Sequence, residues 1–157
     1  MGYDLDLYRL SSRFSQDYPC DKYPELLCKT GRPYTCLLID SHYDYFICVP
    51  FRSFIKHKNA FLFHGTSRSK RTISGLDYSK IIIVQNNDYL DSDPKPVVDS
   101  NEYKEMIKNL PYIVKDVNDY VNTYVKHVNG TEPIHFRKFA RKYGCFTLPY
   151  FHDILGV

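Results

Sequence analysis

Apolar and polar residues alternate along much of the first half of the chain, and apolar residues recur every three or four positions in the second half. Alternation is typical of strands with one buried face, whereas the longer spacing is typical of amphipathic helices. The change of period comes near residue 99. The pattern therefore predicts an α+β fold, in which an antiparallel sheet of about five strands is followed by helices.

The strand-like segments differ in how clearly they are marked. Tyr34 to Asp40 and Tyr43 to Val49 are separated only by Ser41 and His42, which predicts a hairpin whose second strand stops at Pro50. Lys80 to Gln85 contains an unbroken apolar run and predicts a buried central strand. The full set of predicted strands is 4–10, 34–40, 43–49, 60–63 and 80–85, with one helical turn at most over 25–29.

One long helix is predicted to begin at Asp99 or Ser100 and to end near Gly130. Its apolar stripe keeps the same phase on both sides of Pro111, so we expect a kink at the proline and no break. A basic helix is predicted over 135–143, stopped by Gly144, and a short helix over 149–155. We expect the stripe of the long helix to lie against the sheet.

Composition limits the class of protein. The chain has 157 residues, 43% of them hydrophobic, which predicts one globular domain over 1–157. No apolar run reaches the roughly 18 residues that a membrane span requires, and the acidic start does not resemble a signal peptide. The five cysteines form no C-x-x-C pair. We expect a cytoplasmic protein with reduced cysteines and no membrane partner.

Charge is concentrated more than the net value of +3 suggests. Between Phe46 and Lys80 the chain carries seven Lys or Arg residues and two His, against the single acid Asp77. A second basic segment runs from Lys126 to Lys142. Separate basic regions of this kind favour contact with a polyanion, and the 15 Tyr and 10 Phe are compatible with stacking on nucleic-acid bases.

The basic stretch has the residue types that metal-free RNA cleavage requires. Such cleavage needs proton transfer from the ribose 2′-hydroxyl, protonation of the leaving oxygen, and cations for the charge on the phosphate. Ser53 can donate to a non-bridging oxygen, and Arg52 can bind the phosphate with two hydrogen bonds. His57 is the candidate for proton transfer, because the ordinary pKa of histidine is near neutrality. A solvated loop histidine is the competing interpretation of His57.

The other cations are candidate RNA contacts because they cluster, although each one taken alone is better explained as a solvated surface charge. They are Lys56, Lys58, His64, Arg68, Lys70, Arg71, Lys80, Arg137, Lys138, Arg141 and Lys142. No His or Cys pair has zinc-site spacing, and no glycine-rich nucleotide loop is present. We therefore expect neither a metal nor another cofactor.

Several segments resemble the toxins of type III toxin–antitoxin systems. They are LDLYRLSSRF, GRPYTCLLID and PFRSFIKHKNAFLF, with RSK, SGLDYSK, EYKEMIKNLP and the closing YFHDILG. The resemblance covers nearly the whole chain for the CptN branch of the ToxN and AbiQ toxins. Against the wider ToxN branch it is weaker and concentrated between Tyr3 and Lys58.

The resemblance implies a twisted, partly open antiparallel sheet flanked by helices, and an endoribonuclease that leaves a 2′,3′-cyclic phosphate. It further implies that the toxin processes a repetitive RNA antitoxin into pseudoknots, which then block the site in a closed protein–RNA assembly, with cellular RNAs as the other substrates. Such systems act in phage defence.

The resemblance also places candidate catalytic residues. The Pro-x-Thr-Ser motif and the following lysine of ToxN-type sequences correspond to Pro50, Arg52, Ser53 and Lys56, with Arg52 in place of threonine. The lysine expected before the preceding strand corresponds to Arg32, with Lys29 as the alternative. An arginine stays protonated and is a poor base, which gives His57 more weight. A basic RNA-binding module without catalysis remains the alternative function.

Overall fold

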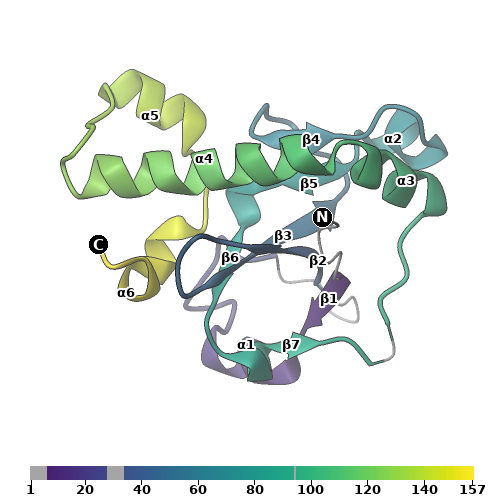
Figure 1. Cartoon of the computed structure of the whole chain (residues 1–157), viewed down its shortest axis with the longest axis horizontal. Coiled ribbons are helices and arrows are strands. Elements are labelled where there is room, and N and C mark those ends of the chain that lie inside the picture. Colours follow the sequence, from purple (N-terminus) through teal and green to yellow (C-terminus); the bar gives the residue numbers. More distant parts are fainter. Residues whose placement is uncertain (1–6, 28–33, 94) are drawn as a thin grey trace.

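The computed structural model describes residues 7–27, 34–93 and 95–157. In it, an open antiparallel sheet is crossed by a long helix, and shorter helices lie at the ends of the sheet (Figure 1). The α+β fold class with an open antiparallel sheet flanked by helices is confirmed.

Strand β3 (Phe46–Arg52) has more strand partners than any other described strand. One edge of β3 pairs with β2 (Thr35–Asp40), which confirms the predicted hairpin. Its connection covers residues 41–45, where the sequence predicted Ser41 and His42 alone. Its other edge pairs first with β6 (Ile82–Val84) and then with β5 (Gly75–Asp77). Because Phe51 and Arg52 pair with Leu76 and Gly75 of β5, the strand continues past Pro50, where the sequence predicted its end.

The remaining strands extend the sheet on both sides of β3. They are β1 (Leu7–Leu10), β4 (Ala60–Leu62) and β7 (Leu90–Asp91), and the strand order is β4-β5-β3-β2-β1-β7. Strands β1 and β4 were predicted, whereas β5 and β7 were not. Strand β6 is fully buried as expected, but among the described strands it pairs only with β3, so it is not central.

Two consecutive helices replace the single kinked helix of the sequence prediction. Helix α3 (Ser100–Lys108) and helix α4 (Leu110–Val128) meet at Asn109. Pro111 lies in the first turn of α4, where its missing backbone N–H costs no helical hydrogen bond. The break therefore comes just before the proline. Helix α4 runs across the sheet with α3 at one end (Figure 1).

Four shorter helices complete the secondary structure. Helix α5 (Phe136–Lys142) and helix α6 (His152–Leu155) confirm the two predicted late helices. Helix α1 (Ser12–Asp17) and helix α2 (Ser67–Thr72) were not predicted. The described residues also form short 3-10 helices, which are η1 (Tyr78–Lys80), η2 (Asn87–Tyr89) and η3 (Leu148–Phe151).

The hydrophobic core lies between α4 and the sheet. The stripe of α4, which includes Ile113, Val117 and Val121, is buried in the same cluster as the inward side chains of β2, β3 and β6. Within the described residues, no helix is both long and apolar enough to span a membrane.

The cysteines only partly match the expectation that all are reduced. Cys36 and Cys48 are buried free thiols in β2 and β3, and Cys145 is an exposed free thiol. Cys20 is disulfide-bonded, which corrects the expectation for that residue.

Candidate functional site

Ser53 follows the last residue of β3 and is held by an arginine from a different element. The Nε of Arg68, in α2, donates a hydrogen bond of 2.9 Å to the Ser53 hydroxyl oxygen. Since that oxygen acts as the acceptor, the hydroxyl hydrogen of Ser53 is available to donate to a ligand. A phosphate oxygen placed there would meet both this hydroxyl and the half-exposed guanidinium of Arg68.

A buried acid fixes the orientation of Arg68. Glu102, in the first turn of α3, is fully buried, and its Oε2 lies 3.4 Å from the Nη1 of Arg68. Its Oε1 accepts a hydrogen bond of 2.7 Å from the hydroxyl of Ser74. A buried carboxylate needs such partners, because an unpaired charge in the interior is costly. We call Ser53, Arg68, Ser74 and Glu102 the serine cluster.

A second buried acid organises the other basic residues of the stretch. Asp77, at the end of β5, is fully buried, and its Oδ2 lies 2.8 Å from the Nη1 of Arg52. Its Oδ1 accepts from the backbone N–H of Ser79 at 3.0 Å and from the Ser79 hydroxyl at 2.6 Å. The Nε2 of His57 lies 3.1 Å from the same oxygen. We call Arg52, His57, Asp77 and Ser79 the histidine cluster.

The hydrogen bonds of His57 define its tautomer. The Nδ1 atom accepts a hydrogen bond of 3.1 Å from the backbone N–H of Asn59, so this nitrogen carries the lone pair. The proton of the neutral ring is then on Nε2, which faces Asp77 and lies 3.2 Å from the hydroxyl of Ser79. Both ring nitrogens therefore have partners, and His57 must give up its bond from Asn59 before Nδ1 can accept a proton.

The two clusters include residues that are neighbours in the sequence, but the side chains of one cluster bind different partners from those of the other. Arg52 and Ser53 are consecutive, but Arg52 is the last residue of β3 and Ser53 lies in the bend that follows it. Among the described residues, no side-chain hydrogen bond or ion pair joins the two clusters. The structure thus brings Arg52 to His57 and Ser53 to Arg68, but it does not bring Ser53 and His57 into direct contact.

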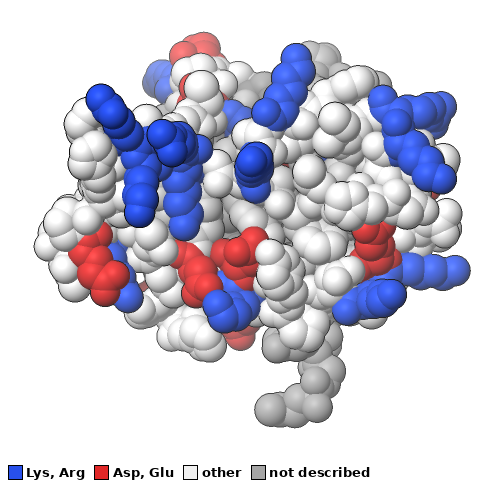
Figure 2. Space-filling model, turned by 90° about the horizontal axis from the view of Figure 1, so that it is seen from above, with Lys and Arg blue, Asp and Glu red and all other residues white. Residues whose placement is uncertain are grey.

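The other predicted RNA-binding cations are mostly at the surface. Viewed from above, Lys and Arg side chains gather over α5 and over α2, with acidic side chains along one side (Figure 2). The exposed members are Lys56, Lys58, Lys70, Arg71, Arg137, Lys138 and Arg141, together with His64, and Lys142 is half-buried. The two regions are connected through the His57 loop, since the Asn59 side chain donates to the carbonyl of Arg141 at 3.3 Å.

Lys80 is not at the surface with the other predicted cations. Lys80 is buried, and its Nζ lies 3.0 Å from a carboxylate oxygen of Glu25 and 2.9 Å from the carbonyl of Cys145. Its ammonium is therefore engaged inside the fold and does not face a ligand. Lys29 and Arg32, the candidates for an upstream catalytic group, lie outside the described residues.

Sequence reasoning missed the two acids that hold the clusters together. Asp77 was noted only as the single acid among many cations, and Glu102 was not identified as a site residue. An isolated acid in a basic stretch is the signal that could have identified Asp77, because it has many possible cationic partners. Nothing in the sequence marks Glu102 as buried.

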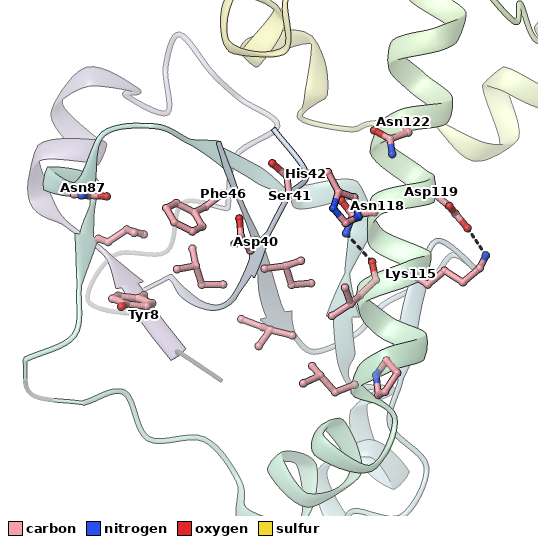
Figure 3. Close-up of a pocket in the computed structure, with 17 residues that line it drawn as sticks. Tyr8, Asp40, Ser41, His42, Phe46, Asn87, Lys115, Asn118, Asp119 and Asn122 are labelled. Atoms are coloured by element: carbon pink, nitrogen blue, oxygen red, sulfur yellow. Dashed lines mark hydrogen bonds and ion pairs between the residues drawn. The ribbon is translucent and has the colours of Figure 1, made fainter. Parts of the chain in front are cut away.

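A cavity lies away from both clusters. It has a volume of about 1060 Å³ and opens between α4 and the hairpin of β2 and β3. Figure 3 shows Tyr8, Asp40 and Phe46 on the sheet side and Asn118 and Asn122 on the helix side. No residue of the serine or histidine cluster lines it, so it has no role in the chemistry considered above. In the described part of the chain, no three His, Cys, Asp or Glu side chains gather as around a metal ion.

Comparisons of this chain with protein-family models, with curated proteins and with solved structures find no match.

Proposed function

We propose that the protein is a metal-independent endoribonuclease, the toxin of a type III toxin–antitoxin system of the CptN branch. The observation that carries the proposal is the Ser53–Arg68 pair, in which a free hydroxyl hydrogen and a half-exposed guanidinium are directed by the buried Glu102. Such a pair is suited to a phosphate that gains negative charge during cleavage. The exposed cations around it supply electrostatic attraction for RNA.

Each residue of the site has a distinct role in this proposal. Ser53 and Arg68 bind the non-bridging oxygens of the scissile phosphate. The 2′-hydroxyl loses its proton and attacks this phosphate, the bond to the 5′-oxygen breaks as that oxygen takes up a proton, and the products carry a 2′,3′-cyclic phosphate and a 5′-hydroxyl. His57 transfers a proton, held in place by Asp77 and close to Arg52. The resemblance adds Arg32 or Lys29 as a further group near the phosphate.

The partners follow from the resemblance. The antitoxin is a repetitive RNA that the protein cuts into pseudoknot units, and these units occupy the site within a closed protein–RNA assembly in the cytoplasm. Cellular RNAs are the substrates of the free toxin.

A basic RNA-binding module without catalysis is the alternative, and one observation favours it. Both ring nitrogens of His57 already have partners within the protein, so the resting ring has no free lone pair. Under this alternative, the histidine cluster only stabilises the loop that presents Lys56 and Lys58.

The deciding experiment uses purified protein and a short end-labelled RNA, with and without excess EDTA. The endonuclease proposal expects cleavage that EDTA does not diminish, with 2′,3′-cyclic phosphate ends. Binding without any new RNA ends would support the alternative. Expression of the protein with and without the DNA just upstream, followed by mapping of RNA ends, tests the antitoxin. Tandem repeats in that DNA whose RNA relieves toxicity are the expected result.

A further inference from the structure

Two exposed apolar residues next to the serine cluster have an unusual backbone conformation. Phe54 has a φ of 57° and Ile73 a φ of 51°, and among the described residues only Cys145 is a further non-glycine case. The left-handed region is unfavourable for bulky and β-branched side chains and is normally occupied by Gly or Asn. These two residues therefore hold conformations that the rest of the fold must impose.

The backbone hydrogen bonds show how the conformations are imposed. The N–H of Phe54 donates to the carbonyl of Thr72 at 2.6 Å, and the N–H of Ile55 donates to the carbonyl of Ile73 at 3.1 Å. The segment after β3 is thereby fastened to the end of α2. Ile55, the neighbour of Phe54, is buried and anchors this segment in the interior.

The side chains of Phe54 and Ile73 are exposed to solvent, whereas that of Ile55 is buried. Phe54 is 63% exposed and Ile73 is 55% exposed. Glycine would satisfy the same backbone at lower cost and without apolar surface in water. Most of the ring at position 54 is in water, where it adds no burial to the fold, and this indicates a role in contact with a partner.

The surroundings of the ring indicate the chemistry of that partner. Phe54 follows Ser53 directly, and Ile73 ends the helix that carries Arg68, Lys70 and Arg71. An apolar surface bordered by cations fits a ligand that has flat apolar faces and negative charge together, which describes a nucleotide in RNA. An apolar protein partner would gain nothing from these cations.

We propose that Phe54, flanked by Ile73, stacks on the nucleobase next to the phosphate that Ser53 and Arg68 hold. The ring would draw one base out of its own stack and so contribute to the choice of the cleavage position. This inference rests on the proposed function for the identity of the phosphate site, but it concerns binding, which is measured independently of cleavage.

The protein contains no tryptophan, and this allows a direct test. In Phe54→Trp the introduced indole should be quenched when single-stranded RNA binds. Tyr43→Trp is the matched control, because Tyr43 is also 63% exposed but lies in the hairpin at the other end of β3, and its fluorescence should not change. Unchanged fluorescence of Phe54→Trp at saturating RNA would overturn the proposal.

Affinity measurements distinguish stacking from charge. Phe54→Ala should bind single-stranded RNA about 5- to 150-fold more weakly, the range expected for one lost base stack, while its affinity for inorganic polyphosphate stays unchanged. Phe54→Gly should show the same loss together with a higher Tm, because glycine relieves the backbone strain. Equal RNA affinity of these variants and the wild type would contradict the proposal. Quenching without any RNA cleavage would retain it and count against the endonuclease alone.

Discussion

Ser53 is the single residue on which the proposed chemistry depends most directly. Ser53→Ala removes one hydrogen bond to the developing negative charge, and comparable sites lose about 10²- to 10³-fold in rate from such a change. The fold should persist, because the side chain has one partner and is only half-buried. The measurement is the cleavage rate of a short RNA at equal protein concentration.

Ser67→Ala is the control for this substitution, since Ser67 is exposed at the start of α2. Ser67→Ala should cleave at the wild-type rate and Ser53→Thr should restore part of the activity. Wild-type toxicity from Ser53→Ala, expressed at the wild-type level, would refute the role of this hydroxyl.

His57 is the residue expected to give cleavage its pH dependence. The Nδ1 atom can take up a proton only after it loses its bond from Asn59. We expect a bell-shaped rate profile around neutrality for the wild type and loss of most cleavage in His57→Ala. His42→Ala, which changes an exposed histidine of the β2–β3 turn, should leave the profile unchanged. If His57→Ala keeps the wild-type profile, another group transfers the proton.

Single residues also show where prediction from sequence reaches its limit. Ser53, Arg52 and His57 were identifiable because their chemistry is intrinsic to the residue type. The functions of Asp77 and Glu102 depend on burial and on partners that lie 20 to 34 positions away in the chain. Such pairings follow from the complete fold, and no local pattern encodes them.

Among the elements, the pairing of β4 with β5 depends on a glycine. A Cβ atom on Gly75 would lie 2.2 Å from the backbone oxygen of Phe61, so the two strands approach too closely for any side chain at this position. Gly75→Ala should lower the free energy of unfolding by about 1–3 kcal/mol, as overpacking does elsewhere. Urea unfolding checks this, with Gly65→Ala as the control, because its Cβ would meet only a side-chain atom at 3.8 Å. Equal stability of the two variants would contradict the expectation.

Buried tyrosines pack α4 against the segment after α5. We expect the folded state to lose stability in alkali because of them. The rings of Tyr120 and Tyr143 lie 4.8 Å apart, and burial raises the pKa of both hydroxyls. Burial likewise raises the pKa of Tyr45 to about 12. The folded state therefore favours the protonated form, so this contribution is complete below pH 10 and is lost as the pH rises above it.

Urea unfolding at pH 8, 10 and 11.5 should therefore show stability falling over the last interval. Tyr143→Phe should show a smaller fall, because it removes one of these hydroxyls. A free energy of unfolding that is constant from pH 8 to 11.5 would contradict the argument.

The elements differ in how well the sequence predicts them. The β2–β3 hairpin and the stripe of α4 have several periods of their pattern, and both were found. Helix α2 has the sequence SRSKRT, with no apolar stripe, and it is stabilised by reciprocal hydrogen bonds between Thr66 and Ser69. Strand β5 has three residues and forms only because β3 and β4 lie on either side of it. Elements this short are determined by their neighbours.

At the scale of the whole molecule, the positive charge is divided between the region of α2 and the region of α5 (Figure 2). RNA that contacts both regions releases counterions from both, so the slope of log affinity against log salt should be steep. Lys70→Ala with Arg71→Ala should flatten this slope by roughly 1 to 2 units, and Lys138→Ala with Arg141→Ala should do so by a similar amount. The four changes together should have the sum of the two effects.

The matched control is Lys115→Ala, because Lys115 is equally cationic and exposed but is paired with Asp119 on α4 at 2.7 Å. For Lys115→Ala, the slope of log affinity against log salt should equal that of the wild type. An RNA affinity that does not depend on salt would refute the electrostatic basis of binding altogether. A slope that only the α2 pair flattens would restrict the interface to the side of Ser53, and the RNA would then contact the serine cluster without reaching α5.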